Sequence, residues 1–124
     1  MVVAEAIREE LLEHAREEAP NEACGLVVLR DDTAVRYERG RNAAASPYRF
    51  RLEVDPEVWF LEDEGYQLAV FHSHPSSPPR PSRTDLAQIG LWEGRPYLIL
   101  RVDTGELAAW RITDGTAEEA PLSA

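Results

Sequence analysis

The sequence of 124 residues contains no lysine, and all thirteen of its basic residues are arginine. Modification of a lysine side chain is therefore excluded. The basic residues are outnumbered by 23 acidic ones, which gives a formal net charge of −10. Proteins bind nucleic acids and anionic membranes through basic patches, so this charge argues against both partners. A solvated acidic surface is the simplest consequence of the composition.

Cysteine and long apolar segments are also scarce. Cys24 is the only cysteine, so the chain cannot form an internal disulfide, and nothing indicates an oxidising compartment. The first residues include Glu5, Glu9 and Glu10 where a secretory signal would have an apolar core. No stretch approaches the roughly 20 apolar residues that a transmembrane helix needs. We therefore expect a cytoplasmic protein.

The length is that of one small domain that can bury a core without disulfides. We expect this domain to span residues 1–113. Residues 114–124 are mostly small and acidic, and we expect them to form a loose C-terminal tail. No internal repeat or linker divides the chain.

Hydrophobic periodicity predicts a helix followed by strands. Apolar residues recur at helical spacing over residues 3–18, and Pro20 ends this helix. His14 falls in its polar half and is expected to be solvated. Residues 23–29 form a nearly continuous apolar run, typical of a strand covered on both faces. Residues 33–39 alternate and are expected to form its hairpin partner.

The second half of the chain has the same kind of pattern. Asp55-Pro56-Glu57 is a typical helix start, and Gly65 is expected to end that helix. The other expected elements are an extended segment at 48–54, a central strand at 66–74, a helix at about 83–91 and a final pair of strands at 97–102 and 107–112. Together these elements predict an α/β fold with a mixed β-sheet flanked by helices.

The most informative stretch is Phe71-His72-Ser73-His74-Pro75, at the end of the central strand. Alternate residues of a strand share a side, so His72 and His74 present their imidazoles on one face. Pro75 cannot donate to a sheet ladder and ends the strand. After a proline-rich loop, Asp85 can add a carboxylate oxygen. Two imidazoles, one carboxylate and a fourth position for water form the ligand set of a catalytic zinc site.

Each part of this pattern has a simpler explanation when it stands alone. A His-x-His pair can consist of two surface histidines without a function. Ser82 with Asp85 three residues later is typical of a helix N-cap. The combination favours the metal site, because two of the three histidines in the chain occur here.

A zinc hydrolase also needs a base beside the attacking water. Glu22 and Glu53 each lie near the end of an expected strand. We favour Glu22, because it leads into a strand covered on both faces, where a carboxylate without a role is costly. A solvated glutamate at the start of the strand is the alternative.

Glu22, His72-Ser73-His74-Pro75 and Ser82-Arg83-Thr84-Asp85 together resemble the signature of the JAMM (MPN+) metalloproteases. In that signature a glutamate is followed, after a variable gap, by His-x-His and, after ten further residues, by an aspartate. The segment from Pro20 to Leu26 also resembles the one that carries the family's glutamate. The resemblance covers most of the chain and implies the JAMM/MPN fold, which is similar to that of the cytidine deaminases.

The resemblance also implies a role for each matching residue. His72, His74 and Asp85 would bind one zinc ion per chain. Glu22 would hold and deprotonate a water molecule, and Ser82 would donate a hydrogen bond to the developing oxyanion. The family hydrolyses amide or isopeptide bonds at the C-terminus of ubiquitin or ubiquitin-like proteins, and its short bacterial members act on ubiquitin-like sulfur carriers. We therefore interpret the chain as a zinc metallopeptidase with such a tail as its substrate.

Other classes of function fit the sequence less well. A zinc deaminase needs His-x-Glu and a later Pro-Cys-x-x-Cys, which the chain lacks, and nothing in the sequence orients a histidine toward Cys24 for cysteine protease chemistry. A non-catalytic MPN-type scaffold or binding module is the main alternative, but such scaffolds usually lose ligands that this chain keeps. One hypothesis is that the Cys24 thiolate reaches the metal and holds the enzyme latent. A small buried residue is the simpler interpretation.

Overall fold

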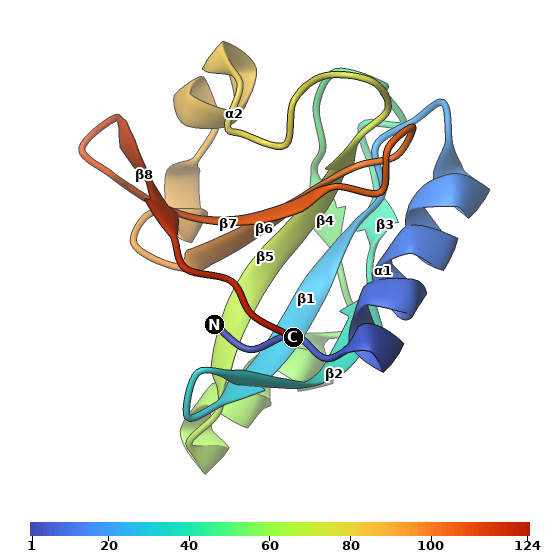
Figure 1. The fold of residues 1–124 in the computed structure, drawn as a ribbon. Helices are drawn as coiled ribbons and strands as arrows, with labels where there is room; N and C mark the ends of the chain where they lie inside the picture. The colour runs from blue at the N-terminus through green and yellow to red at the C-terminus, as the bar shows by residue number, and fades with distance from the viewer.

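The computed structural model describes the backbone of residues 1–124 and all side chains except that of Leu91. Across these residues, six strands form the main sheet in the order β2-β1-β5-β6-β7-β8. They are β1 (Cys24–Arg30), β2 (Thr33–Arg39), β5 (Gln67–His74), β6 (Pro96–Arg101), β7 (Leu107–Thr113) and β8 (Thr116–Ala120). Only β5 and β6 pair in parallel (Figure 1). The expected mixed sheet is therefore confirmed.

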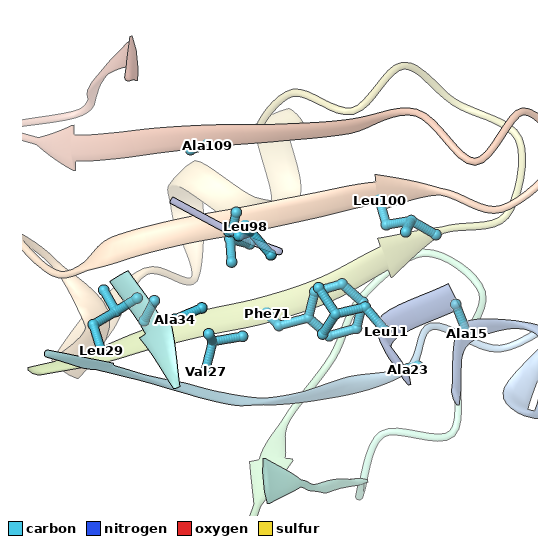
Figure 2. Close-up of a cluster of buried hydrophobic side chains, with 12 residues drawn as sticks. Leu11, Ala15, Ala23, Val27, Leu29, Ala34, Phe71, Leu98, Leu100 and Ala109 are labelled. Atoms are coloured by element: carbon cyan, nitrogen blue, oxygen red, sulfur yellow. The ribbon is translucent and has the colours of Figure 1, made fainter. Parts of the chain in front are cut away.

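Helix α1 (Glu5–Glu18) confirms the first predicted helix and covers one face of the sheet. Its Leu11 and Ala15 are fully buried and belong to the same apolar cluster as Phe71 of β5 and Leu98 of β6 (Figure 2). Burial of a leucine-sized side chain stabilises the fold by about 1.5–3 kcal/mol. In the part of the chain that the structure describes, no helix is both long and apolar enough to cross a membrane.

The expectation that His14 is solvated is wrong. Its side chain is buried, with 3% exposure, although it lies on the helix α1. Nδ1 of His14 lies 2.7 Å from the hydroxyl oxygen of Tyr37 on β2, which provides a hydrogen-bond partner. Periodicity within α1 could not reveal this partner, because it comes from a strand 23 residues away.

The opposite face of the sheet is covered by 3-10 turns and a short helix. The first, η1 (Pro56–Glu64), begins where predicted, because Asp55 Oδ1 accepts a hydrogen bond of 3.0 Å from Glu57 N–H. It ends at Gly65, whose φ of 91° is easily adopted without a side chain. The helix expected at 83–91 is divided into α2 (Arg83–Ala87) and η2 (Gly90–Trp92).

Two short strands lie beside the start of β1. The strand β3 (Arg41–Asn42) pairs antiparallel with β4 (Leu52–Glu53). The extended segment expected at 48–54 is therefore a regular strand only over its fifth and sixth residues. The connection between β3 and β4 forms a loop against the end of the sheet, and its side chains contribute to the site described below.

The C-terminal residues are not a loose tail. Residues 116–120 form β8, which pairs with β7 and covers its edge. Ser123 then exchanges backbone hydrogen bonds with the N-terminal segment, from Ser123 N–H to Met1 O at 3.0 Å and from Val3 N–H to Ser123 O at 2.8 Å. Figure 1 shows the two termini close together. The small, acidic composition concealed this strand because it gives only a weak apolar alternation.

Deletion of residues 114–124 is expected to lower the free energy of unfolding by about 2–4 kcal/mol. The deletion removes the pairing with β7 and the bonds to the N-terminal segment, and each hydrogen bond contributes about 0.5–1.5 kcal/mol. Urea denaturation followed by circular dichroism measures the change. Removal of Ala124 alone, which lies beyond these contacts, is the control. Equal stability of the two shortened proteins would contradict the structural role of β8.

Candidate active site

The site lies where the end of β5 meets the start of β1. His72 and His74 are almost completely buried, with 0% and 2% exposure. The antiparallel register places Cys24 of β1 opposite His72. Glu22 lies two residues earlier and therefore reaches the level of His74. The β1–β5 pairing thus brings residues about 50 positions apart into one site.

Asp85 enters this site from the first turn of α2. Its backbone N–H donates to Ser82 Oγ at 3.0 Å, and its Oδ2 accepts from Ser82 N–H at 2.9 Å. These two bonds form a capping box at the start of the helix. The capping pattern is present, and it does not prevent the Asp85 carboxylate from lying beside the two histidines. The cap fixes the carboxylate that faces the histidines.

Four buried groups converge at this point. Glu22, His72, His74 and Asp85 each offer one ligand atom, and these atoms all lie within 4.8 Å of one another. Nε2 of His72 lies 3.2 Å from both His74 Nε2 and Asp85 Oδ2, and His74 Nε2 lies 3.1 Å from the same oxygen. Donor atoms at 2.0–2.1 Å from a tetrahedral zinc ion would be about 3.3 Å apart. The observed triangle has this size.

The protonation of the histidine rings is also consistent with a metal site. Nδ1 of His74 lies 2.8 Å from the carbonyl oxygen of Pro78, which can only accept, so Nδ1 carries the proton. In a neutral ring, Nε2 then presents a lone pair to Asp85 Oδ2. Burial lowers the pKa of His74, but its contacts with Asp85 and the Pro78 carbonyl outweigh this effect and raise it, so without a metal ion a second proton on Nε2 can bridge to Asp85. A metal ion would take the place of that proton, so the donor set fits a metal ion.

The titration of these groups is strongly perturbed by burial. Burial raises the pKa of Glu22 to about 8, and the nearby Asp85 carboxylate adds to the increase. Burial also raises the pKa of Asp85, but hydrogen bonds from His72 and His74 outweigh this effect and hold it well below its usual value. Burial lowers the pKa of His72, which favours the neutral ring that binds metals.

Two buried atoms of the cluster have no hydrogen-bond partner among the described residues. They are Oε1 of Glu22 and Nδ1 of His72. Unsatisfied buried polar atoms are uncommon in folded proteins and often mark sites that bind a ligand. The Glu22 atom belongs to the carboxylate that faces the ligand atoms of the cluster. This places a free acceptor beside the position that a cation would occupy.

Glu53, the other candidate for the base, and Cys24, the candidate inhibitory thiol, both lie outside the cluster. Glu53 is exposed on β4 and pairs with Arg41 at 3.0 Å, so its carboxylate is already engaged. Cys24 is not among the clustered residues. Burial raises the pKa of its thiol to about 12, which disfavours the thiolate that inhibition of a metal site would need.

Three residues that support the site were missed in the sequence. Ser73 is buried, and its Oγ accepts a hydrogen bond of 2.8 Å from Ala23 N–H, next to Glu22. The ring of Phe50 stacks on His72 with 4.5 Å between ring centroids. The amide of Asn42 holds the loop that carries Phe50. Only the position of Ser73 between the two histidines hinted at such a role.

Comparisons with known proteins agree with this geometry. Residues 4–113 match the family model Prok-JAB, described as prokaryotic homologs of the JAB domain. The chain belongs to this family. It is 31% identical over 121 residues to the CysO-cysteine peptidase of Mycobacterium tuberculosis, covering 91% of this chain and 83% of the relative. It is 37% identical over 108 residues to a desampylase of Haloferax volcanii, covering 77% and 76%.

The fold of the family is also evident in a solved structure. The JAB1/MPN domain protein AF2198 from Archaeoglobus fulgidus superposes with a TM-score of 0.65, covering 99% of this chain and 97% of that protein. Its sequence is 21% identical, so this likeness concerns the fold alone. The expected JAMM/MPN fold is confirmed. The peptidase relatives confirm a hydrolase of amide or isopeptide bonds.

Replacement of Ser73 by alanine is expected to lower the free energy of unfolding by about 1–3 kcal/mol, because the buried Ala23 N–H loses its partner. Chemical denaturation measures this loss. Ser73→Thr keeps a hydroxyl and serves as the matched variant. If Ser73→Ala unfolds at the same denaturant concentration as the unmodified protein, the hydrogen bond does not secure the start of β1.

Proposed function

We propose that this Prok-JAB protein is a zinc metallopeptidase that cleaves an amide bond at the C-terminus of a ubiquitin-like or sulfur-carrier protein. The observation that carries the proposal is the convergence of four buried potential ligands within 4.8 Å. Three of them form a triangle of metal-ligand size, and the fourth is a carboxylate with a free oxygen. This arrangement supplies a metal site and a base at the same place.

Zinc is the ion that fits the donor set best. His72 Nε2, His74 Nε2 and Asp85 Oδ2 would hold it, leaving a position open, which is the ligand count of catalytic zinc sites. Mg²⁺ and Ca²⁺ prefer sites made of oxygen atoms. The hydrogen bond from His74 Nδ1–H to the Pro78 carbonyl holds that ring in the tautomer which binds through Nε2.

When bound, such an ion supplies Lewis-acid chemistry that polarises the carbonyl group and acidifies water. The residues of the chain perform the proton transfers. The Glu22 carboxylate takes a proton from the attacking water and gives it to the departing amine. The positive charge of an ion would keep Glu22 ionised despite its burial, because a nearby cation favours the charged form.

Ser82 stabilises the oxygen of the scissile carbonyl as negative charge develops. Its Oγ already accepts the N–H of Asp85, and a serine hydroxyl retains its own proton for donation. The hydroxyl therefore caps the helix and donates to the oxyanion at the same time. Loss of one oxyanion donor typically costs a factor of 10²–10³ in kcat.

The substrate class follows from the relatives. One is named a CysO-cysteine peptidase and another a desampylase, and both cover most of this chain. The position of the site at the end of the sheet is compatible with cleavage of the extended tail of a protein. A cytoplasmic location, and the absence of nucleic-acid and membrane partners, stay predictions. A non-catalytic scaffold would not need the complete set of ligands together with the base.

Asp85→Ala and Glu22→Gln are expected to separate metal binding from catalysis. Asp85→Ala removes a ligand, so its zinc content falls well below one ion per chain and activity is lost. Glu22→Gln keeps the ligand triangle, so it retains about one zinc ion, whereas kcat falls by a factor of about 10²–10⁴. Metal analysis and hydrolysis of a Gly-Gly-aminomethylcoumarin peptide measure the two properties.

Chelation with a zinc-specific chelator should abolish hydrolysis, and added zinc should restore it. Activity that survives both chelation and Asp85→Ala would contradict the proposed mechanism. A protein without stoichiometric zinc whose partner binding is unchanged in Glu22→Gln would instead be a scaffold.

Ser82→Gly is expected to lower kcat by a factor of about 10²–10³, because glycine removes the hydroxyl donor. Glycine is also a tolerated N-cap that costs only a few tenths of a kcal/mol, and its backbone N–H keeps the bond to Asp85 Oδ2, so α2 and the position of Asp85 are retained. Ser82→Thr keeps both the cap and the donor and should retain most of the activity. Full kcat in Ser82→Gly, with normal zinc content, would show that the hydroxyl serves only as a cap.

A further inference from the structure

A groove with a volume of about 520 Å³ lies beside the metal-ligand cluster. We call it the arginine groove; the residues that matter here are Arg49, Phe50, Arg51, Leu52, Gln88 and Trp92. Phe50 connects it to the site, since its ring stacks on His72. A molecule in the groove therefore lies next to the reacting bond.

The lining of the groove is positively charged, although the protein as a whole is acidic. Arg49 and Arg51 are both exposed and line it, and none of the described residues of its lining is acidic. Neither arginine forms an ion pair within the described part of the chain. The nearest carboxylate in the sequence, that of Glu53, is paired with Arg41.

Some arginines elsewhere in the chain form ion pairs with carboxylates, whereas others, such as Arg16, form none within the described residues. Arg36 pairs with Glu38, Arg39 with Glu17, and Arg95 with Glu62. In a chain with a net charge of −10, carboxylates are plentiful partners for any arginine. What distinguishes Arg49 and Arg51 is that both line the same groove, so two guanidinium groups without an ion pair are available there to one ligand. They offer five N–H donors each and favour carboxylates.

The backbone that carries the two arginines is held in place before any ligand arrives. Asn42 Nδ2 donates to the carbonyl of Arg49 at 3.1 Å, and Asn42 Oδ1 accepts from the N–H of Arg51 at 3.0 Å. The same amide donates to the carbonyl of Glu22 at 3.0 Å and accepts from the N–H of Ala44 at 3.0 Å. Asn42 thus uses its full hydrogen-bonding capacity to fix the arginine segment relative to the base. Such preorganisation reduces the entropy lost on binding.

We propose that the arginine groove binds an acidic segment of the substrate protein close to its C-terminus. This inference rests on the proposed function and specifies which tails the enzyme prefers. A volume of about 520 Å³ is that of a pocket for several residues rather than for one small anion. Phe50, Leu52 and Trp92 provide apolar contacts for the carbon chains of glutamate or aspartate. Trp92 is itself fixed by stacking on Trp59, with 5.3 Å between ring centroids.

The expected selectivity is moderate because the arginines are exposed. A solvent-exposed ion pair contributes about 0.2–1 kcal/mol, so two pairs would favour an acidic tail by roughly 10-fold at low salt. The preference should decrease as salt rises, because the screening length falls to about 10 Å at 0.1 M salt. This dependence distinguishes charge recognition from apolar contact.

The test compares two fluorescein-labelled peptides that end in Gly-Gly and differ in the two preceding residues. One peptide has two glutamates there and the other has two glutamines. Both are products rather than substrates, so anisotropy titration with the zinc-loaded enzyme measures binding alone. Amidated versions of both peptides, titrated with the zinc-loaded Glu22→Gln variant so that their amide bond stays intact, separate side-chain carboxylates from the terminal one. We expect the glutamate peptide to bind roughly 10-fold more tightly in both forms at low salt.

The double variant Arg49→Gln/Arg51→Gln should bind the two peptides within about two-fold of each other. Its backbone contacts to Asn42 involve main-chain atoms and are retained. Arg16→Gln/Arg36→Gln is the control, since it causes the same change in net charge at exposed positions that do not line the groove. The control should keep the preference for glutamate.

Three results would overturn the proposal. They are equal binding of the two peptides by the unmodified enzyme, absence of binding by both, and an undiminished preference in the groove variant. Hydrolysis of a Gly-Gly-aminomethylcoumarin peptide is measured on the same samples. Hydrolysis without charge selectivity overturns only the groove, whereas charge selectivity without hydrolysis overturns only the peptidase.

Discussion

The central constraint on the structure is that three potential metal-ligand atoms lie close together inside the protein. Nε2 of His72, Nε2 of His74 and Oδ2 of Asp85 lie 3.1–3.2 Å apart, and all three side chains are buried. Burial strengthens the electrostatic interactions among these atoms. A metal ion would be bound by all three of them at once. The surrounding fold serves to hold the three atoms in place.

The sheet and its loops divide this task. Pairing of β1 with β5 places Glu22 beside the histidines, and the bond from Ser73 to Ala23 secures that junction. The capping box of α2 fixes Asp85 from the other side. Asn42 then joins the carbonyl of Glu22 to the backbone of Arg49 and Arg51, so the groove and the cluster share one set of hydrogen bonds.

Much of this could be predicted from the sequence, for local reasons. The histidines share a face because strands alternate, and Glu22 was favoured because it precedes a strand buried on both faces. The supporting contacts could not be predicted, because they join distant segments. His14 is buried against Tyr37 of a distant strand, and β8 pairs with the edge of β7. Asn42 resembled any polar loop residue until its four partners were placed around it.

Anomalous diffraction at the zinc edge, from crystals of the zinc-loaded protein, tests the central claim most directly. We expect one ordered zinc ion bound by Nε2 of His72, Nε2 of His74 and Oδ2 of Asp85, with the Glu22 carboxylate beside the remaining position. An ion bound elsewhere, or no ordered ion with the three side chains still converging, would contradict it.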